Sequence, residues 1–405
     1  MTHTAFDLSS LPGMSPEEAV NTVLQQAIAR RASDVHLMAE KRSHSIAVRR
    51  NGTLQFVGAV PAELGRAMIV YIKANAGMDI TEHRRPLDGR WLVDDGRVDV
   101  RINILPTMQG EDLCLRIWSR SYDQLSLSNI GFFPSDLANL EQLLNAPSGL
   151  ILVTGPTGTG KTTTLYACLQ HLNRGLRKIN TLEDPVEYLL PGIRQSQVNV
   201  KIGVDFPELL RSVLRQAPDV IMVGEIRDPQ TAQIAVRAAN SGQLVLATIH
   251  AQVAAAAIRN LLFFDVSPHF LADCLLAVIS QRLYRRLCVE CRAEYRVDEG
   301  SHMYEEVAEL LGPGQQNRFF GSRGCEACFG EGYDTRGALI EMLKVNRAIR
   351  QLISTGAAPA EMQCAAIENG MIEFRRGALL KIAGGETSPE EILRVIPVEH
   401  LGIGE

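Results

Sequence analysis

The chain has 405 residues, of which 46% are hydrophobic and 21% are charged, and its formal net charge is −5. This composition excludes a disordered or fibrous chain and is typical of a large globular protein with two or three domains. No apolar run is long enough to span a bilayer, and the first residues lack the apolar core of a signal peptide. We therefore expect a cytoplasmic protein, and its well-mixed charges argue against a nucleic-acid motor.

Residues 1–120 predict a small α+β domain. A helix is expected over 16–31, and Asn51-Gly52 is a typical hairpin turn between two strands. The β-type runs of this region lie at 45–50, 54–60, 97–104 and 113–118. Residues 121–136 turn from polar to apolar and predict a linker.

Residues 137–280 predict an α/β domain, because strand-like and helix-like segments alternate along the chain. The apolar runs lie at 150–154, 178–182, 219–223 and 244–248, and helical segments at 163–174, 206–216 and 229–240. Such alternation favours a parallel sheet that helices cover on both faces.

The first of these strands leads into a phosphate-binding loop. Residues 151–163 read Ile-Leu-Val-Thr-Gly-Pro-Thr-Gly-Thr-Gly-Lys-Thr-Thr, which is a strand, the pattern G-x-x-x-x-G-K-T and a helix start. Glycines let backbone N–H groups turn toward a nucleotide's phosphates, Lys161 reaches the β- and γ-phosphates, and Thr162 offers a hydroxyl to Mg²⁺. The predicted nucleotide-binding residues are Gly155, Pro156, Thr157, Gly158, Thr159, Gly160, Lys161, Thr162 and Thr163. The pattern predicts an ATP site.

Polar residues follow three other predicted strands, at the sheet edge where an α/β fold gathers its ligands. Glu225 follows the run at 219–223, where a carboxylate can orient an attacking water. The segment Thr181-Leu-Glu-Asp-Pro-Val-Glu187 carries three carboxylates, and His250 follows the run at 244–248. Taken alone, the acidic segment fits a solvated loop and His250 fits a structural histidine. Beside a phosphate loop, both become candidates for the nucleotide site.

Four cysteines form two C-x₂-C pairs with the spacing of a structural zinc site. Cys288 pairs with Cys291 and Cys325 with Cys328, and residues 292–324 lie between the pairs. A disulfide is disfavoured in a cytoplasmic chain, and redox C-x-x-C motifs usually occur singly. We therefore predict a zinc-binding segment over 281–340, with a helical excursion at Met303–Leu311, followed by a helical region over 341–405.

Taken together, these motifs resemble one family, the hexameric assembly ATPases of bacterial type II secretion and type IV pilus systems. The segments that carry the resemblance, besides the phosphate loop and the four cysteines, are Leu182–Glu187, Leu214–Asp228, Thr248–His250, Gln281–Leu283, Ala32–His36, Arg85–Arg90 and Asp99–Arg101 with Arg116. The chain departs from the family pattern at Gln243, Ala251, Gln252 and Ala217.

The resemblance implies a fold and roles for the residues. The fold would be a PAS-like N-terminal α+β domain (1–120) and a RecA-like ATPase core (137–280) with a Cys₄ zinc insertion and a helical C-terminus. Glu225 would be the catalytic glutamate, and Glu183 and Glu187 would organise metal and water. His250 would contact the γ-phosphate, and Arg101 and Arg116 would swing from the N-terminal domain over the nucleotide.

The resemblance also implies an assembly, namely a homo-hexamer with ATP, Mg²⁺ and Zn²⁺ as cofactors. The ring would act on a membrane-embedded platform protein, with other secretion or pilus components as partners, at the cytoplasmic side of the inner membrane and without direct contact to nucleic acid. The tetracysteine element favours an assembly motor over a retraction motor. Two alternatives stay open, namely a conjugation-type DNA-transfer ATPase and a ring subunit that binds ATP with little hydrolysis.

Overall fold

The chain forms two compact units in the computed structural model, which describes residues 6, 8, 10–94, 96–119, 125–296, 318–397 and 400. The first unit comprises 1–122 together with 288–292 and 322–335. The second comprises 123–287, 293–321 and 336–405. The helix predicted at Met303–Leu311 lies outside the described residues, as do residues 121–124 of the predicted linker.

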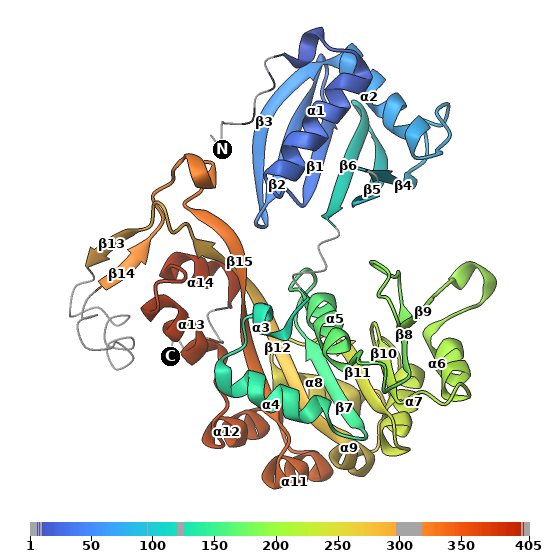
Figure 1. The fold of residues 1–405 in the computed structure, drawn as a ribbon, viewed down its shortest axis with the longest axis vertical. Helices are drawn as coiled ribbons and strands as arrows, with labels where there is room; N and C mark the ends of the chain where they lie inside the picture. Colours follow the sequence, from blue (N-terminus) through green and yellow to red (C-terminus); the bar gives the residue numbers. More distant parts are fainter. Residues whose placement is uncertain are drawn as a thin grey trace. The chain divides into compact units, whose positions relative to one another are not determined.

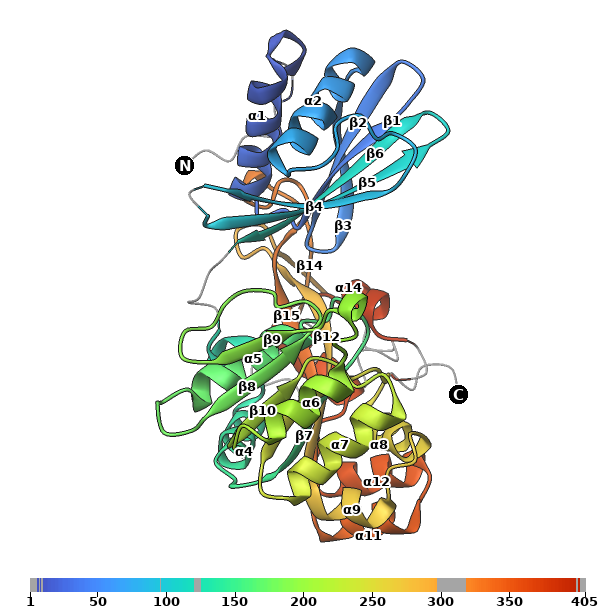
Figure 2. The same ribbon diagram turned by 90° about the vertical axis from the view of Figure 1, so that its right-hand side faces the viewer.

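The N-terminal part of the first unit is an antiparallel sheet covered by two helices (Figure 1 and Figure 2). Its elements are α1 (Pro16–Ala29), β1 (Asp34–Ala39), β2 (Ser43–Arg50), β3 (Thr53–Pro61), α2 (Ala62–Asn75), β4 (Leu87–Val93), β5 (Val98–Thr107) and β6 (Gly110–Ser119), preceded by a 3₁₀ turn at Leu11–Gly13. The strand order is β3-β2-β1-β6-β5-β4. Arg50 lies opposite Thr53, and Asn51 and Gly52 have φ of +49° and +83°, which confirms the predicted hairpin turn.

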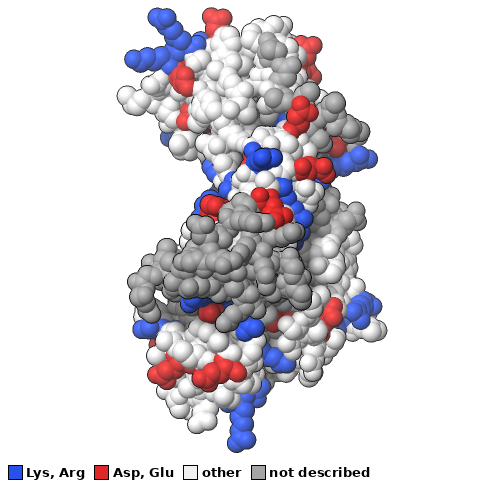
Figure 3. Space-filling model, turned by 90° about the vertical axis from the view of Figure 1, so that its left-hand side faces the viewer, with Lys and Arg blue, Asp and Glu red and all other residues white. Residues whose placement is uncertain are grey.

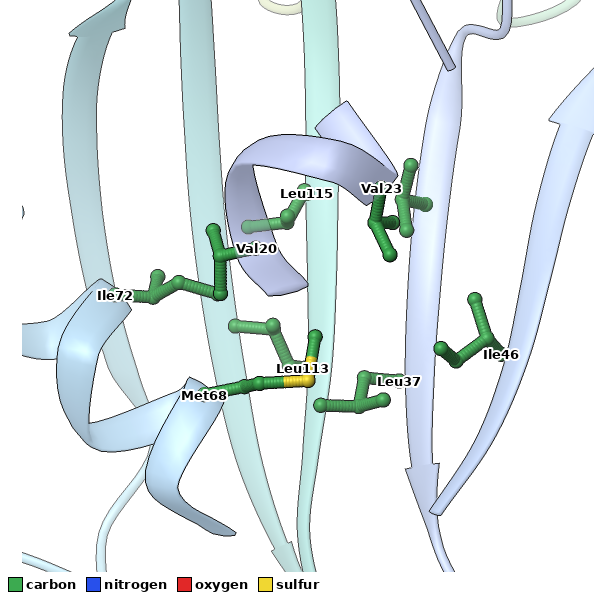
Figure 4. A pocket seen from close by; sticks show the side chains of 9 residues that line it. Val20, Val23, Leu37, Ile46, Met68, Ile72, Leu113 and Leu115 are labelled. Carbon is green, nitrogen blue, oxygen red and sulfur yellow. The ribbon is translucent and has the colours of Figure 1, made fainter. Parts of the chain in front are cut away.

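The core of this unit is apolar, and α1 illustrates how the sequence builds it. Ser15 and Glu18 form a reciprocal capping box at its start, and Pro16 occupies the first helical position. Between the two helices and the sheet lies a small cavity of about 10 Å³ (Figure 4). It is lined by Val20, Val23, Val35, Leu37, Ile46, Met68, Ile72, Leu113 and Leu115. A space of this size without a polar lining is a packing gap and not a ligand site.

The second unit is built on a mainly parallel sheet with the strand order β15-β12-β7-β11-β10-β8-β9. Its strands are β7 (Gly149–Thr154), β8 (Ile179–Glu183), β9 (Arg194–Gln197), β10 (Val220–Val223), β11 (Leu244–Ile249), β12 (Leu275–Leu287) and β15 (Tyr333–Lys344). The helices that precede β12 in the chain are α3 (Leu127–Ile130), α4 (Pro134–Leu144), α5 (Lys161–Leu172), α6 (Phe206–Leu214), α7 (Pro229–Asn240), α8 (Ala254–Phe263) and α9 (Pro268–Cys274). The strands β12, β7, β11, β10, β8 and β9 pair in parallel.

Both faces of this sheet are buried, as the continuous apolar runs predict. Leu150 and Leu152 of β7 belong to one core cluster, while Ile151 and Val153 belong to the cluster on the opposite face. The first cluster contains residues of α6, α7 and α8 and of two later helices, α11 (Arg347–Thr355) and α12 (Pro359–Glu368). The second contains residues of α4 and α5. Since neighbouring strand residues point to opposite faces, a run that is apolar throughout belongs to a doubly covered sheet.

The remaining elements follow β12 in the chain. They are the two-stranded pair β13 (Ala293–Arg296) and β14 (Arg318–Gly321), a 3₁₀ turn at Glu326–Cys328, and the helices α11 (Arg347–Thr355), α12 (Pro359–Glu368), α13 (Phe374–Ala383) and α14 (Pro389–Val395). Earlier in the chain, a 3₁₀ turn at Val200–Ile202 lies between β9 and α6. No helix in the described part of the chain has the length and apolar character needed to cross a bilayer. The predicted class, α/β with a strand-rich N-terminal region and a helical C-terminus, is confirmed.

Candidate nucleotide site and cysteine centre

The phosphate loop lies where β7 ends and α5 begins. Gly155 and Gly160 have φ of +140° and +84°, backbone conformations that other residues rarely adopt. Thr162 and Thr163 are exposed in the first turn of α5, where free N–H groups and the helix dipole favour an anion. Both threonines are thus accessible at a helix N-terminus, as binding of a phosphate and its Mg²⁺ requires.

Lys161 lies folded against its own loop. Its Nζ donates to Gly155 O (2.9 Å) and Pro156 O (2.8 Å). Burial lowers the pKa of Lys161, and the nearby Glu225 carboxylate opposes that shift. The ammonium group must exchange two carbonyl oxygens for phosphate oxygens when a nucleotide binds, and anionic oxygens are the stronger acceptors.

Glu225 and His250 meet at the neighbouring strand ends. Glu225 follows β10 and His250 follows β11, and the two strands pair in parallel. His250 Nε2 lies 2.6 Å from Glu225 Oε1, and Arg227 Nε donates to Glu225 Oε2 at 2.6 Å. The carboxylate is 15% exposed. Both oxygens of the carboxylate thus have a partner, and their remaining lone pairs can accept a hydrogen bond from a water.

The acidic segment after β8 divides into a buried and an exposed part. Glu183 is 2% exposed and accepts hydrogen bonds from Tyr166 Oη, Thr181 Oγ1 (2.5 Å) and Gln195 Nε2 (3.0 Å). Burial and the adjacent Glu183 raise the pKa of Tyr166, so this phenol stays a donor. Glu183 therefore lies at the centre of a buried hydrogen-bond network. Its occurrence in a run of acidic residues did not indicate this burial.

Asp184 and Glu187 are more accessible. Arg227 Nη1 lies 3.7 Å from Asp184 Oδ2, so one guanidinium group connects Asp184 with Glu225. Glu187 is half-buried, and its backbone N–H donates to Tyr166 Oη (3.4 Å). Arg227 was not assigned to the site from the sequence, because a charged side chain two residues beyond a strand is usually solvated.

The four predicted cysteines converge although the two pairs are far apart in the sequence. Their Sγ atoms all lie within 4.8 Å of one another. The Sγ–Sγ distances are 3.9 Å for Cys288–Cys325 and 3.7 Å for both Cys291–Cys328 and Cys325–Cys328. A tetrahedral zinc with Zn–S bonds of about 2.3 Å requires separations of about 3.8 Å. The four thiolates therefore fit the closed tetrahedral coordination of a structural Zn²⁺.

Arg50, from the end of β2, anchors this cysteine cluster to the N-terminal sheet within the first unit. Its guanidinium group donates to Cys328 O (3.1 Å), Glu331 Oε2 (2.9 Å) and Asp334 Oδ1 (3.0 Å). It also lies 4.9 Å from the centre of the Phe329 ring, and its side chain is 4% exposed. The cysteine segments thus pack with the N-terminal sheet through a buried, multiply bonded arginine.

Arg101 and Arg116 face each other across β5 and β6 of the first unit. Arg116 Nε donates to Asp34 Oδ1 (2.9 Å), and the Arg101 guanidinium lies 5.6 Å from the centre of the Trp118 ring. The Arg116 side chain is 60% exposed. Their approach to a nucleotide stays a prediction, because the phosphate loop belongs to the other unit.

Comparisons with known proteins agree with this arrangement. Residues 14–394 match the family model described as "Type II/IV secretion system protein". The chain is 41% identical over 378 residues to the type II secretion system protein HxcR of Pseudomonas aeruginosa, covering 93% of this chain and 76% of that protein. It is 37% identical over 381 residues to the type IV pilus assembly ATPase PilB of Thermus thermophilus, covering 93% of this chain and 42% of that protein.

A solved structure shows that this fold occurs elsewhere. The ATPase DotB of Legionella pneumophila matches with a TM-score of 0.70 and 19% identity, over 94% of this chain and 95% of that one. At that identity the likeness concerns the fold alone. The family match and the identity to HxcR extend over almost the whole chain, and they confirm the resemblance that the motifs indicated. The chain belongs to the type II/IV secretion system protein family.

Proposed function

We propose that this chain is a Mg²⁺-dependent ATPase that powers assembly of a type IV pilus or of a type II secretion pseudopilus. The observation that carries the proposal is the convergence of Lys161, Glu225 and His250 at the ends of β7, β10 and β11, which are neighbouring strands of one parallel sheet. The relatives named for type II secretion and for pilus assembly support this activity and this setting.

The residues have distinct tasks in this mechanism. The backbone N–H groups of residues 155–163 and Lys161 bind the phosphates, and Thr162 holds Mg²⁺, which supplies charge neutralisation for phosphoryl transfer. Glu225 orients the attacking water and accepts its proton, while His250 and Arg227 hold the carboxylate in place. Glu183 and Glu187 shape the adjacent segment, with Glu183 acting through Tyr166 and Gln195.

Arg101 and Arg116 complete the proposal from the N-terminal unit. An arginine that reaches the transferring phosphoryl group offsets its charge, and such residues contribute about 10³–10⁵ in rate in related phosphoryl-transfer enzymes. Movement of the N-terminal unit toward and away from the nucleotide would turn hydrolysis into a mechanical stroke. Zn²⁺ would be held by Cys288, Cys291, Cys325 and Cys328 as a structural ion.

We further propose a homo-hexameric ring at the cytoplasmic side of the inner membrane, bound there through a platform protein and other secretion or pilus components. Direct nucleic-acid binding is not part of the proposal. On the face shown in Figure 3, the described acidic and basic residues are interspersed and leave broad uncharged areas. A DNA-transfer motor requires a continuous basic path for the phosphate backbone.

The test is steady-state phosphate release with Mg²⁺-ATP, combined with light scattering to weigh the particle. The wild type should turn over as a ring-sized particle, and Lys161→Ala should neither bind nor hydrolyse ATP. A wild-type ring that binds ATP without releasing phosphate would contradict the motor assignment and favour a binding-only ring subunit. Stimulation of turnover by DNA would favour the DNA-transfer alternative.

A further inference from the structure

Strand β12 runs past the end of its neighbour β7 and so reaches the phosphate loop (Figure 1). The last paired residues are Ser280 and Thr154, and the loop starts one residue later. Gln281 is therefore the first residue of β12 beyond the pairing, and it stands beside the loop. Its side chain is 1% exposed.

The side-chain amide of Gln281 joins the loop to the helix that follows it. Nε2 donates to Thr159 O (2.5 Å), and Oε1 accepts from Thr164 Oγ1 (2.8 Å). Thr164 lies in the first turn of α5 and is 1% exposed. Both polar ends of a buried amide are thereby satisfied, so the side chain has one fixed orientation.

The backbone of β12 comes equally close to the loop. A Cβ atom added at Gly155 would lie 2.5 Å from Gln281 O, and one added at Gly160 would lie 3.3 Å from Gln281 Nε2. The inner side of the loop therefore packs closely against Gln281, and the glycines allow the close approach.

The bond to Thr159 O fixes the orientation of a peptide group. In a trans peptide the C=O of one residue and the N–H of the next point in opposite directions. Since the carbonyl of Thr159 is directed toward Gln281, the N–H of Gly160 is directed away from it, toward the outer side of the loop where phosphate would bind. Without the amide, this peptide group could rotate and present an oxygen to the phosphate.

We propose that Gln281 is a positioning residue that holds the Thr159–Gly160 peptide in the phosphate-binding orientation. The proposal rests on the proposed function of the loop as the ATP site. Gln281 does not touch the nucleotide, and its effect reaches the phosphate through the backbone of the loop.

Gln281→Met tests this, because methionine has a similar length and no amide. We expect the dissociation constant for ATP to rise roughly tenfold, the effect of one lost hydrogen bond, with KM rising alongside and kcat changing less. Thr164→Val is the matched control, since it removes the other bond of the same amide but leaves the bond to Thr159. Its dissociation constant should stay within about twofold of the wild type.

Melting temperatures separate positioning from folding, because both variants disturb buried hydrogen bonds. Gln281→Met leaves Thr159 O and Thr164 Oγ1 without their partner, and Thr164→Val leaves Gln281 Oε1 without its donor. A Gln281→Met protein that melts earlier but binds ATP with wild-type affinity would overturn the proposal, as would equal losses of affinity in both variants. Should Gln281→Met fail to fold, Gln281→Asn keeps an amide that is one methylene too short to reach Thr159, and the same loss of affinity is expected. A wild-type protein that binds no ATP would refute the proposed function itself, and Lys161→Ala marks that baseline.

Discussion

His250 Nε2 and Glu225 Oε1 lie 2.6 Å apart at the ends of two adjacent parallel strands. The contact places a histidine directly on the carboxylate that follows the strand beside it, and Arg227 bonds the other oxygen of that carboxylate. Glu225 is consequently held from both sides. The position of its free lone pairs, and so of any water that it orients, depends on these two partners.

Removing the imidazole should therefore slow hydrolysis without weakening nucleotide binding. We expect His250→Ala to lower kcat by about 10²-fold, in the range for groups that assist proton transfer, while the dissociation constant for ATP stays unchanged. His269→Ala, at an exposed position in α9, is the control and should retain wild-type kcat. Equal kcat values for His250→Ala and the wild type would exclude a role for this contact.

The cysteine centre should hold one structural zinc per chain. Cys288→Ser removes one of four thiolates and should abolish stoichiometric zinc, as measured by elemental analysis, and should increase hydrogen exchange in residues 322–335. Cys364→Ser is a matched control, because Cys364 is exposed in α12 and apart from the cluster. Wild-type protein purified without metal and fully folded would contradict this prediction.

Arg50 should contribute more to the stability of the first unit than an arginine in a surface ion pair does. Arg50→Ala leaves the Glu331 carboxylate buried without its cation, a change that typically costs about 3–5 kcal/mol. Arg50→Lys should not rescue it, because one ammonium group cannot replace the guanidinium bonds to Arg30 O, Cys328 O, Glu331 Oε2 and Asp334 Oδ1. The neighbouring Arg49→Ala, at a side chain that is 39% exposed, should shift the melting temperature little.

Asp136 gives a pH-dependent prediction. It lies 7% exposed in the first turn of α4, and its Oδ2 has no hydrogen-bond partner among the residues that the structure describes. Burial raises the pKa of Asp136 to about 6 from the ordinary value of 3.8. The native state therefore binds this proton more tightly than the unfolded state, and stability from this residue is lost as the pH rises from about 4 to about 6.

Asp136→Asn removes that penalty. We expect the variant to be more stable than the wild type by about 1–3 kcal/mol at pH 7 and similar to it at pH 4. Thermal melting at both pH values measures this difference. A variant that is less stable at pH 7 would show that the charged form of Asp136 has a favourable partner.

The parts of the fold that could be predicted are those whose signal is local. The strands β7, β10 and β11 are short, mainly apolar and separated by helical patterns, and the helix predicted over 229–240 matches α7 at both ends. The run of β12 was not predicted, because Gln281, Arg282, Arg285 and Arg286 interrupt its apolar pattern. Two of these side chains, Gln281 and Arg282, are buried and bonded to distant segments, which no window of sequence can indicate.

The same distinction applies to the site. The phosphate loop, Glu225, His250 and the cysteines were identified from motifs and strand ends, and the structure brings Glu225 to His250 and the four cysteines to one another. The contacts of Gln281 and Arg50 span 122 and 281 residues of sequence. Such contacts form only when the folded topology brings these distant segments side by side, so the sequence alone did not indicate them.

The most direct test of the account is a single turnover of ATP by wild-type protein and by Glu225→Gln. The variant keeps the phosphate loop and loses the carboxylate that accepts the proton from water. We predict that both proteins bind ATP with similar affinity, and that the wild type converts it to ADP while the variant retains it intact. Hydrolysis by Glu225→Gln at the wild-type rate would contradict the account, because the reaction would then not depend on Glu225.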